Sequence, residues 1–105
     1  MILIGDVGGT KTEWMVLENG VSRTFKTLGV NLVHEKLSEF LKKVKKSLEP
    51  FSEADEVYLY FAGLLDVPRQ RRNALNEIKK SFPMAKIAIE NDLLGAARGA
   101  YQTSP

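Results

Sequence analysis

Residues 1–12 read MILIGDVGGTKT, an apolar run followed by one acidic residue and a loop of small and hydroxyl-bearing residues. The run predicts a strand over residues 2–5, and Asp6 at its end can meet a magnesium ion or its waters. The loop offers five residues to an anion: Gly8, Gly9, Thr10, Lys11 and Thr12. Glycines let backbone N–H groups approach a polyanion without a Cβ in the way. The stretch therefore predicts a phosphate-binding loop.

A second apolar run, residues 14–17, follows this loop directly. The loop is therefore expected to be the turn of a hairpin, whereas the Walker and dinucleotide-binding glycine motifs both open a helix. Asn19-Gly20 is a strong two-residue turn signal, because both positions tolerate a positive φ, and it leads into a third strand over residues 21–26. The chain is expected to begin as a three-stranded meander.

Helices and strands alternate in the rest of the predicted order. The first helix is expected before Pro50, with one apolar face made by Val33, Leu37, Phe40, Leu41, Val44 and Leu48. A strand over residues 57–61 precedes a helix that starts at Pro68, and a strand over residues 86–89 precedes a helix capped by Asn91-Asp92. The order is β-β-β-α-β-α-β-α.

This order predicts an α/β domain with a five-stranded mixed sheet, because helical crossovers join parallel strands. Asp6, Ala62-Gly63 and Asn91-Asp92 then all follow the carboxyl ends of neighbouring strands. Ligands of open α/β sheets bind at that edge. We therefore expect these residues to form one site.

Composition narrows the class of protein. A chain of 105 residues with 44% hydrophobic and 27% charged residues fits one globular domain. It contains no apolar stretch near the ~20 residues of a membrane span, no signal-peptide pattern and no cysteine. We expect a cytoplasmic protein without disulfides or thiolate-bound metal.

The net charge of +2 does not by itself indicate a nucleic-acid partner. Lysines cluster at Lys42, Lys43, Lys45 and Lys46, between apolar residues at helical spacing, and no aromatic residues alternate with them. They are interpreted as the solvated face of a helix. Arginines cluster at Arg69, Arg71 and Arg72 near a helix start, where an anion contact stays open.

Four segments, in order and at compatible spacing, resemble the N-terminal domain of BadF/BadG-type ATPases, above all N-acetylglucosamine kinases of the sugar kinase, heat-shock protein and actin superfamily. They are residues 6–14 (DVGGTKTEW), 28–31 (LGVN), 61–63 (FAG) and 90–97 (ENDLLGAA). The resemblance implies a ribonuclease-H-like (actin-like ATPase) domain, with ATP and substrate bound in the cleft beside a second domain.

The resemblance also implies residue roles. The glycine-rich loop would hold the ATP phosphates and Asp6 the magnesium, while Asp92 would take the proton from a sugar hydroxyl. The sugar pocket would be lined by Asn31, Ala62, Gly63, Asn91 and Asp92. Phosphoryl transfer depends mainly on positioning and charge neutralisation, so this set is chemically sensible. The alternatives are that Asp92 only caps its helix and that Asn31 only makes a turn.

The family's second domain, with its second phosphate loop and adenosine pocket, has no counterpart before Pro105. We therefore expect an excised domain or a fragment, inactive or nearly so alone, because half a cleft cannot exclude water or orient ATP. Competing assignments are a hexose kinase of the repressor/open-reading-frame/kinase group and an ATPase activator of 2-hydroxyacyl-CoA dehydratases. A non-catalytic binding or assembly module, with possible homodimerisation through exposed apolar surface, is the alternative from another class.

Overall fold

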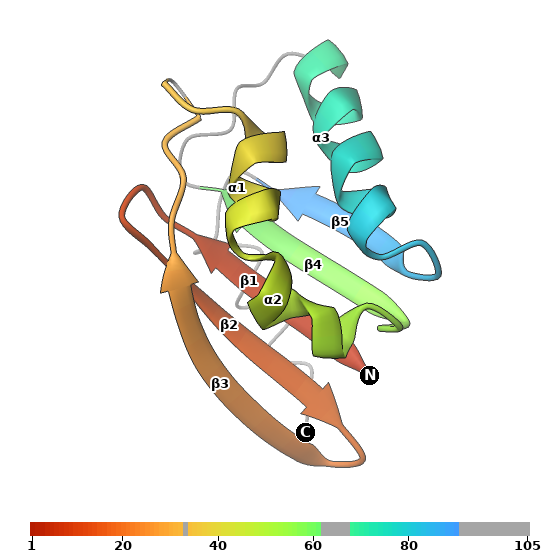
Figure 1. Cartoon of the computed structure of the whole chain (residues 1–105). Helices are drawn as coiled ribbons and strands as arrows, with labels where there is room; N and C mark the ends of the chain where they lie inside the picture. Colours follow the sequence, from red (N-terminus) through yellow and green to blue (C-terminus); the bar gives the residue numbers. More distant parts are fainter. Residues whose placement is uncertain (33, 62–67, 91–105) are drawn as a thin grey trace.

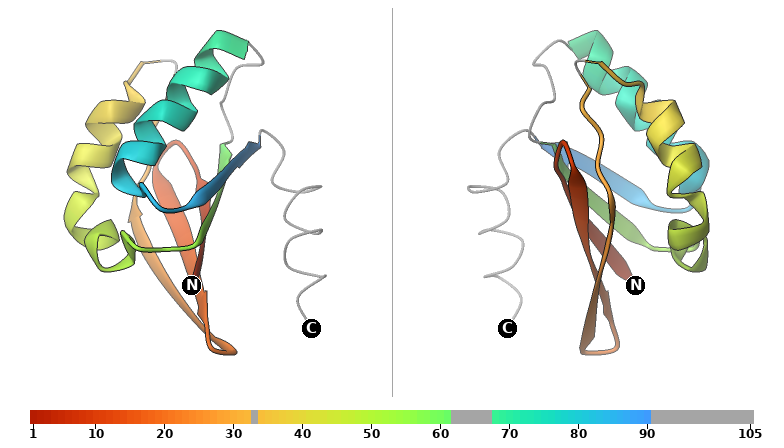
Figure 2. Two further views of the ribbon diagram at one scale, coloured as in Figure 1. Left: turned by 90° about the vertical axis from the view of Figure 1, so that its right-hand side faces the viewer. Right: turned by 60° about the vertical axis from the view of Figure 1, so that its left-hand side comes forward.

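A mixed five-stranded sheet with all its described helices on one face forms this protein (Figure 1). The structure, a computed structural model, describes residues 1–32, 34–61 and 68–90. The elements are β1 (Ile2–Val7), β2 (Lys11–Glu18), β3 (Val21–Leu28), α1 (Leu37–Lys43), α2 (Lys45–Leu48), a 3₁₀ turn (Glu49–Phe51), β4 (Glu56–Phe61), α3 (Pro68–Ser81) and β5 (Lys86–Glu90). Both views of Figure 2 place α1, α2 and α3 on the same side of the sheet.

The strand order is β3-β2-β1-β4-β5, which puts β1 in the centre. Strand β1 pairs antiparallel with β2 and parallel with β4, and β4 pairs parallel with β5. The prediction of a mixed α/β sheet is therefore confirmed. The helix expected after residue 92 lies outside the described residues. In the described part of the chain, no helix is long and apolar enough to cross a membrane.

The hairpin between β2 and β3 forms where its turn residues predict it. Asn19 has a φ of 53° and Gly20 a φ of 76°, and these are the two residues of the turn. Positive φ at both central positions matches the right-handed twist of the flanking strands. Strand β3 is two residues longer than predicted and ends at Leu28.

The prediction of a single continuous helix before Pro50 is wrong. The structure has α1, then a break at Val44 (φ −99°, ψ 6°), then the short α2 and a 3₁₀ turn that contains Pro50. The apolar spacing persists through the break, since Val44 and Leu48 are both buried. The spacing therefore encoded the buried face correctly, while tertiary packing decided where the helix breaks.

Glycine at position 5 makes room for the largest side chain of the core. A Cβ on Gly5 would lie 2.6 Å from Cζ3 of Trp14 and 2.7 Å from Cδ2 of Leu59. Trp14 is 1% exposed, its Nε1 donates to Thr27 Oγ1 at 2.9 Å, and its ring stacks on Phe25. Trp14 is therefore a packing residue of the core.

Gly5→Ala is expected to destabilise the fold by about 1–3 kcal/mol, because the added methyl forces the indole or the backbone to move. Gly9→Ala is the matched control, since nothing lies within 4 Å of a Cβ there, and its effect should stay within about 0.5 kcal/mol. Urea denaturation followed by Trp14 fluorescence measures both. Equal midpoints for the two variants would contradict this account of Gly5.

Candidate functional site

Asp6 lies near the carboxyl end of the central strand, on the sheet face opposite the helices. Leu3 and Val7 belong to the core beneath the helices, and successive side chains of a strand point to opposite faces. In the strand register Asp6 sits between Glu13 of β2 and Tyr60 of β4. The predicted metal carboxylate is thus part of the strand itself rather than the first residue after it.

The pKa of Asp6 is raised above its ordinary value. Burial of the carboxylate is the main cause, and the negative charge of Glu13 adds to it, while the positive charge of Lys11 opposes both. Glu13 is itself shared by two lysines, with Oε1 3.7 Å from Lys11 Nζ and 3.8 Å from Lys26 Nζ. Ionisation of Asp6 therefore lowers the stability of the folded chain. Perturbed carboxylates of this kind are common at functional sites.

The glycine-rich loop is a tight turn between β1 and β2. Gly8 N–H donates to the Lys11 carbonyl at 3.0 Å. The segment that follows β3 closes over the loop, because Gly29 N–H donates to the Thr10 carbonyl at 3.0 Å and Val30 N–H to the Gly8 carbonyl at 2.9 Å. Figure 1 shows this segment running beside the β1–β2 loop. The loop is a hairpin turn, as predicted.

The outer side of the loop is open. Within the described residues, the N–H groups of Gly9 and Thr10 have no hydrogen-bond partner, and both residues are exposed. Neither Gly8 nor Gly9 has a positive φ. A Cβ on Gly8 would lie 2.8 Å from the Lys11 carbonyl oxygen, whereas a Cβ on Gly9 would meet nothing within 4 Å. Two backbone donors without a protein partner thus lie in an exposed turn, which suits an oxyanion.

Thr12 does not belong to the loop, contrary to the prediction. It lies in β2, on the same face as Trp14, and is fully buried. Among the described residues its Oγ1 has no hydrogen-bond partner. A buried hydroxyl without a hydrogen-bond partner lowers the stability of the fold. Packing alone therefore does not explain why a threonine stands at position 12. Lys11 opens the same strand and is exposed.

Asn31 begins a turn before α1. Its carbonyl accepts from the N–H groups of His34 at 3.0 Å and Glu35 at 2.7 Å, and its own N–H donates to Glu35 Oε1 at 3.1 Å. These bonds give Asn31 the turn role that was its alternative interpretation. Asn31 is exposed, which leaves its side chain accessible to a ligand. Its contact with a sugar stays a prediction.

Four predicted site residues lie outside the described residues: Ala62, Gly63, Asn91 and Asp92. The expected meeting of Asp6 and Asp92 at one edge of the sheet therefore stays a prediction. The strands that lead to these residues, β4 and β5, run parallel to β1 and follow it in the sheet.

Two contacts near this edge, made by Gly29 and Arg71, were not predicted from the sequence. Gly29 belongs to the 28–31 segment, and its backbone contacts the glycine-rich loop. Arg71 of α3 donates from Nη2 to the Ile89 carbonyl at 2.8 Å and lies 4.0 Å from Glu90 Oε2. It therefore ties α3 to the carboxyl end of β5. No local pattern identifies either contact, since each joins segments far apart in the sequence.

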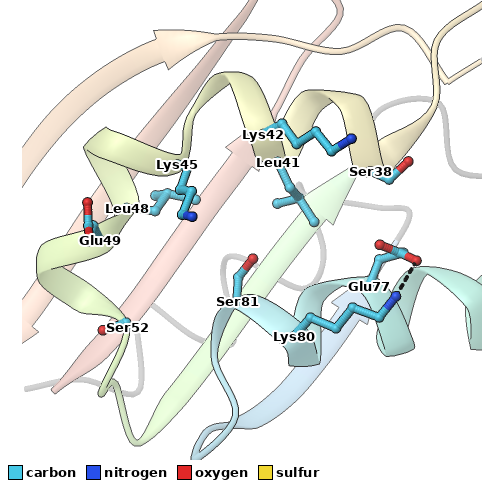
Figure 3. Close-up of a pocket in the computed structure, with 10 residues that line it drawn as sticks. All are labelled: Ser38, Leu41, Lys42, Lys45, Leu48, Glu49, Ser52, Glu77, Lys80 and Ser81. Atoms are coloured by element: carbon cyan, nitrogen blue, oxygen red, sulfur yellow. Dashed lines mark hydrogen bonds and ion pairs between the residues drawn. The ribbon is translucent and has the colours of Figure 1, made fainter.

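A groove of about 560 Å³ runs between α1–α2 and α3 (Figure 3). Leu41 and Leu48 contribute to its lining, together with lysines, serines and two glutamates. Its charges are mixed, and Lys80 is paired with Glu77 at 3.1 Å. No predicted site residue lines it, so it does not bear on the chemistry at the sheet edge.

A magnesium ion fits the donors only as a water-bridged or phosphate-shared ion. The described residues contain no group of three or more histidine, cysteine or acidic side chains that could hold a metal. Mg²⁺ is commonly held by one or two carboxylates, waters and substrate phosphates, so Asp6 beside the predicted phosphate-binding loop fits that mode.

The chain is similar to several solved structures. No family model matches the chain, and no curated protein matches it. Among solved structures, a candidate N-acetylglucosamine kinase from Porphyromonas gingivalis is 30% identical over 97% of this chain, with a TM-score of 0.73. YeaZ from Pseudomonas aeruginosa is 17% identical over 96% of this chain and 48% of its own, with a TM-score of 0.48.

The first match supports an actin-like ATPase fold for this chain. The chain spans 38% of the length of that protein. The TM-score of the second match is too low to support any inference about this chain.

Thr12→Val should leave the fold equally stable or stabilise it by about 1 kcal/mol, because it removes an unpaired buried hydroxyl and keeps the shape. Thr12→Ser, which keeps the hydroxyl and loses the methyl, should destabilise by about 1 kcal/mol. Urea midpoints compare the two variants with the parent chain. A larger loss for valine than for serine would show that the hydroxyl has a partner.

Asp6→Asn should stabilise the chain at neutral pH. Because the folded pKa of Asp6 is raised, its favourable contribution is complete below the unfolded value of about 3.9 and is lost as pH rises through the folded pKa. The gap in urea midpoint between Asn and Asp should therefore widen from pH 4 to pH 7. A gap that is constant or narrows with rising pH would refute the assigned shift.

Proposed function

We propose that this chain is the N-terminal, phosphate-binding domain of an ATP-dependent sugar kinase of the N-acetylglucosamine kinase kind. The observation that carries the proposal is the open turn of Gly9 and Thr10, whose free N–H groups lie at the end of the same hairpin that holds Asp6. The 30% identity over 97% of the chain to the Porphyromonas gingivalis protein supports the assignment.

The loop would bind the phosphates of ATP. Its two free N–H groups are donors, and Lys11, exposed at the start of β2, adds a positive charge that can reach the same anion. Asp6 would hold magnesium through water or directly, and the ion when bound would neutralise charge on the phosphates. The Asp6 carboxylate would thus bind the cation and the loop donors would bind the anion of the same magnesium–ATP complex.

The reaction we propose is a single phosphoryl transfer. The oxygen of a sugar hydroxyl bonds to the γ-phosphorus as the bond from that phosphorus to the β,γ-bridging oxygen breaks, and ADP leaves. Asp92 would accept the hydroxyl proton as general base. Asn31, Ala62, Gly63 and Asn91 would line the sugar pocket.

Residues 1–105 would supply only one wall of this cleft. The chain corresponds to 38% of the length of its solved relative, and the adenosine pocket would come from a second domain. Alone, the chain should bind phosphates weakly and turn over no substrate, because a half-open site leaves the attacking group and ATP exposed to water.

Nucleotide binding tests the proposal directly on this chain. A ¹⁵N-labelled sample titrated with ATP and Mg²⁺ should show concentration-dependent shifts of the Gly9 and Thr10 amides. Asp6→Asn should remove the magnesium dependence of those shifts, while Glu49→Gln, which changes an exposed carboxylate in the 3₁₀ turn, should not. If neither loop amide responds to Mg-ATP, the kinase proposal fails.

The sugar class is decided by the same spectra. N-acetylglucosamine added with Mg-ATP should shift the Asn31 amide, whereas glucose should leave it unchanged. A response to glucose alone would instead support the hexose kinase assignment.

A further inference from the structure

The backbone that leaves β3 lies against the glycine-rich loop, and two donors hold it there. Gly29 N–H and Val30 N–H donate to carbonyl groups of Thr10 and Gly8 at 3.0 and 2.9 Å. Figure 1 shows how the chain after β3 passes the β1–β2 turn. This contact joins segments about twenty residues apart in the sequence.

The contact engages the carbonyl groups of the loop in hydrogen bonds. Three loop carbonyls are tied down, since Gly8 and Thr10 accept from residues 29–30 and Lys11 accepts from Gly8 N–H. Carbonyl oxygens repel an anion, and N–H groups attract one. Of the turn residues 8–10, Gly9 and Thr10 have N–H groups without a partner among the described residues. The loop therefore presents hydrogen-bond donors to solvent.

Only glycine fits at position 29. A Cβ there would lie 2.2 Å from the Gly8 oxygen, 2.6 Å from the Lys11 nitrogen and 2.9 Å from the Thr10 carbonyl carbon. All three are backbone atoms of the loop, so no side-chain rotation relieves the clash. The φ of Gly29 is not positive, so the requirement is one of space and not of backbone conformation.

We propose that Gly29 is a positioning residue for oxyanion binding: its bare backbone lets residues 29–30 bind the loop carbonyls, and this holds the Gly9 and Thr10 N–H groups toward the phosphates. The inference rests on the proposed function for the identity of the ligand. Residues 29–30, which follow β3, would thereby take part in phosphate binding.

The test compares Gly29→Ala with Gly20→Ala by titrating each ¹⁵N-labelled chain with magnesium pyrophosphate. Gly20 is the control because it lies in the other hairpin turn, where alanine is strained by its φ of 76° but meets no atoms within 4 Å. Gly29→Ala should weaken the pyrophosphate-dependent shifts of the Gly9 and Thr10 amides at least tenfold. Gly20→Ala should lose stability and keep the affinity of the parent.

Equal affinity of parent and Gly29→Ala chains would overturn the positioning role while leaving the proposed function standing. No response of the parent chain to pyrophosphate would overturn the phosphate assignment itself.

Hydrogen exchange in the unsubstituted chain decides the positioning even if Gly29→Ala fails to fold. The Gly29 and Val30 amides should be protected, and those of Gly9 and Thr10 should exchange fast. Rapid exchange of the Gly29 and Val30 amides would refute the two hydrogen bonds to the loop carbonyls, and with them the positioning role.

Discussion

The close approach of two backbone segments, residues 8–11 and residues 29–30, organises the functional edge of this protein. The approach depends on the missing side chain of Gly29 and on two hydrogen bonds to loop carbonyls. It converts a hairpin turn, which by itself could present either carbonyl or N–H groups, into a surface of donors. In the proposed function, a hairpin would thereby bind phosphate as a helix N-terminus does in the better-known phosphate loops, without a helix dipole.

The two sides of strand β1 contribute differently to stability. Its helix-facing side is committed to packing, with Gly5 under the indole of Trp14 and Leu3 and Val7 in the core. The opposite side carries Asp6, whose ionised form is disfavoured by burial and by its neighbour. The buried, unpaired hydroxyl on β2 is a second local cost. Costs of this kind concentrate at sites of binding and catalysis, where a folded scaffold tolerates groups that do not stabilise it.

Most of the fold was predictable because its signals are local. Asn19-Gly20 predicts its turn, Pro68 begins α3, and the apolar run at the N-terminus forms β1. The break at Val44 was not predictable, because apolar spacing reports which residues are buried and not whether the backbone between them stays helical. The candidate site shows the same division. Asp6 was predictable from its place after an apolar run, whereas Arg71 was not, because its bond to the Ile89 carbonyl forms only when α3 packs on β5.

The sequence by itself determined the α/β class, the hairpin character of the glycine-rich loop and the placement of an acidic residue beside it. These depend on interactions within a few residues along the chain. Only the tertiary structure decided that Thr12 is buried, that Glu13 stands beside Asp6, and that residues 29–30 close on the loop. The physical reason is that burial, electrostatic neighbours and backbone contacts between distant segments exist only after the strands have paired and the helices have packed.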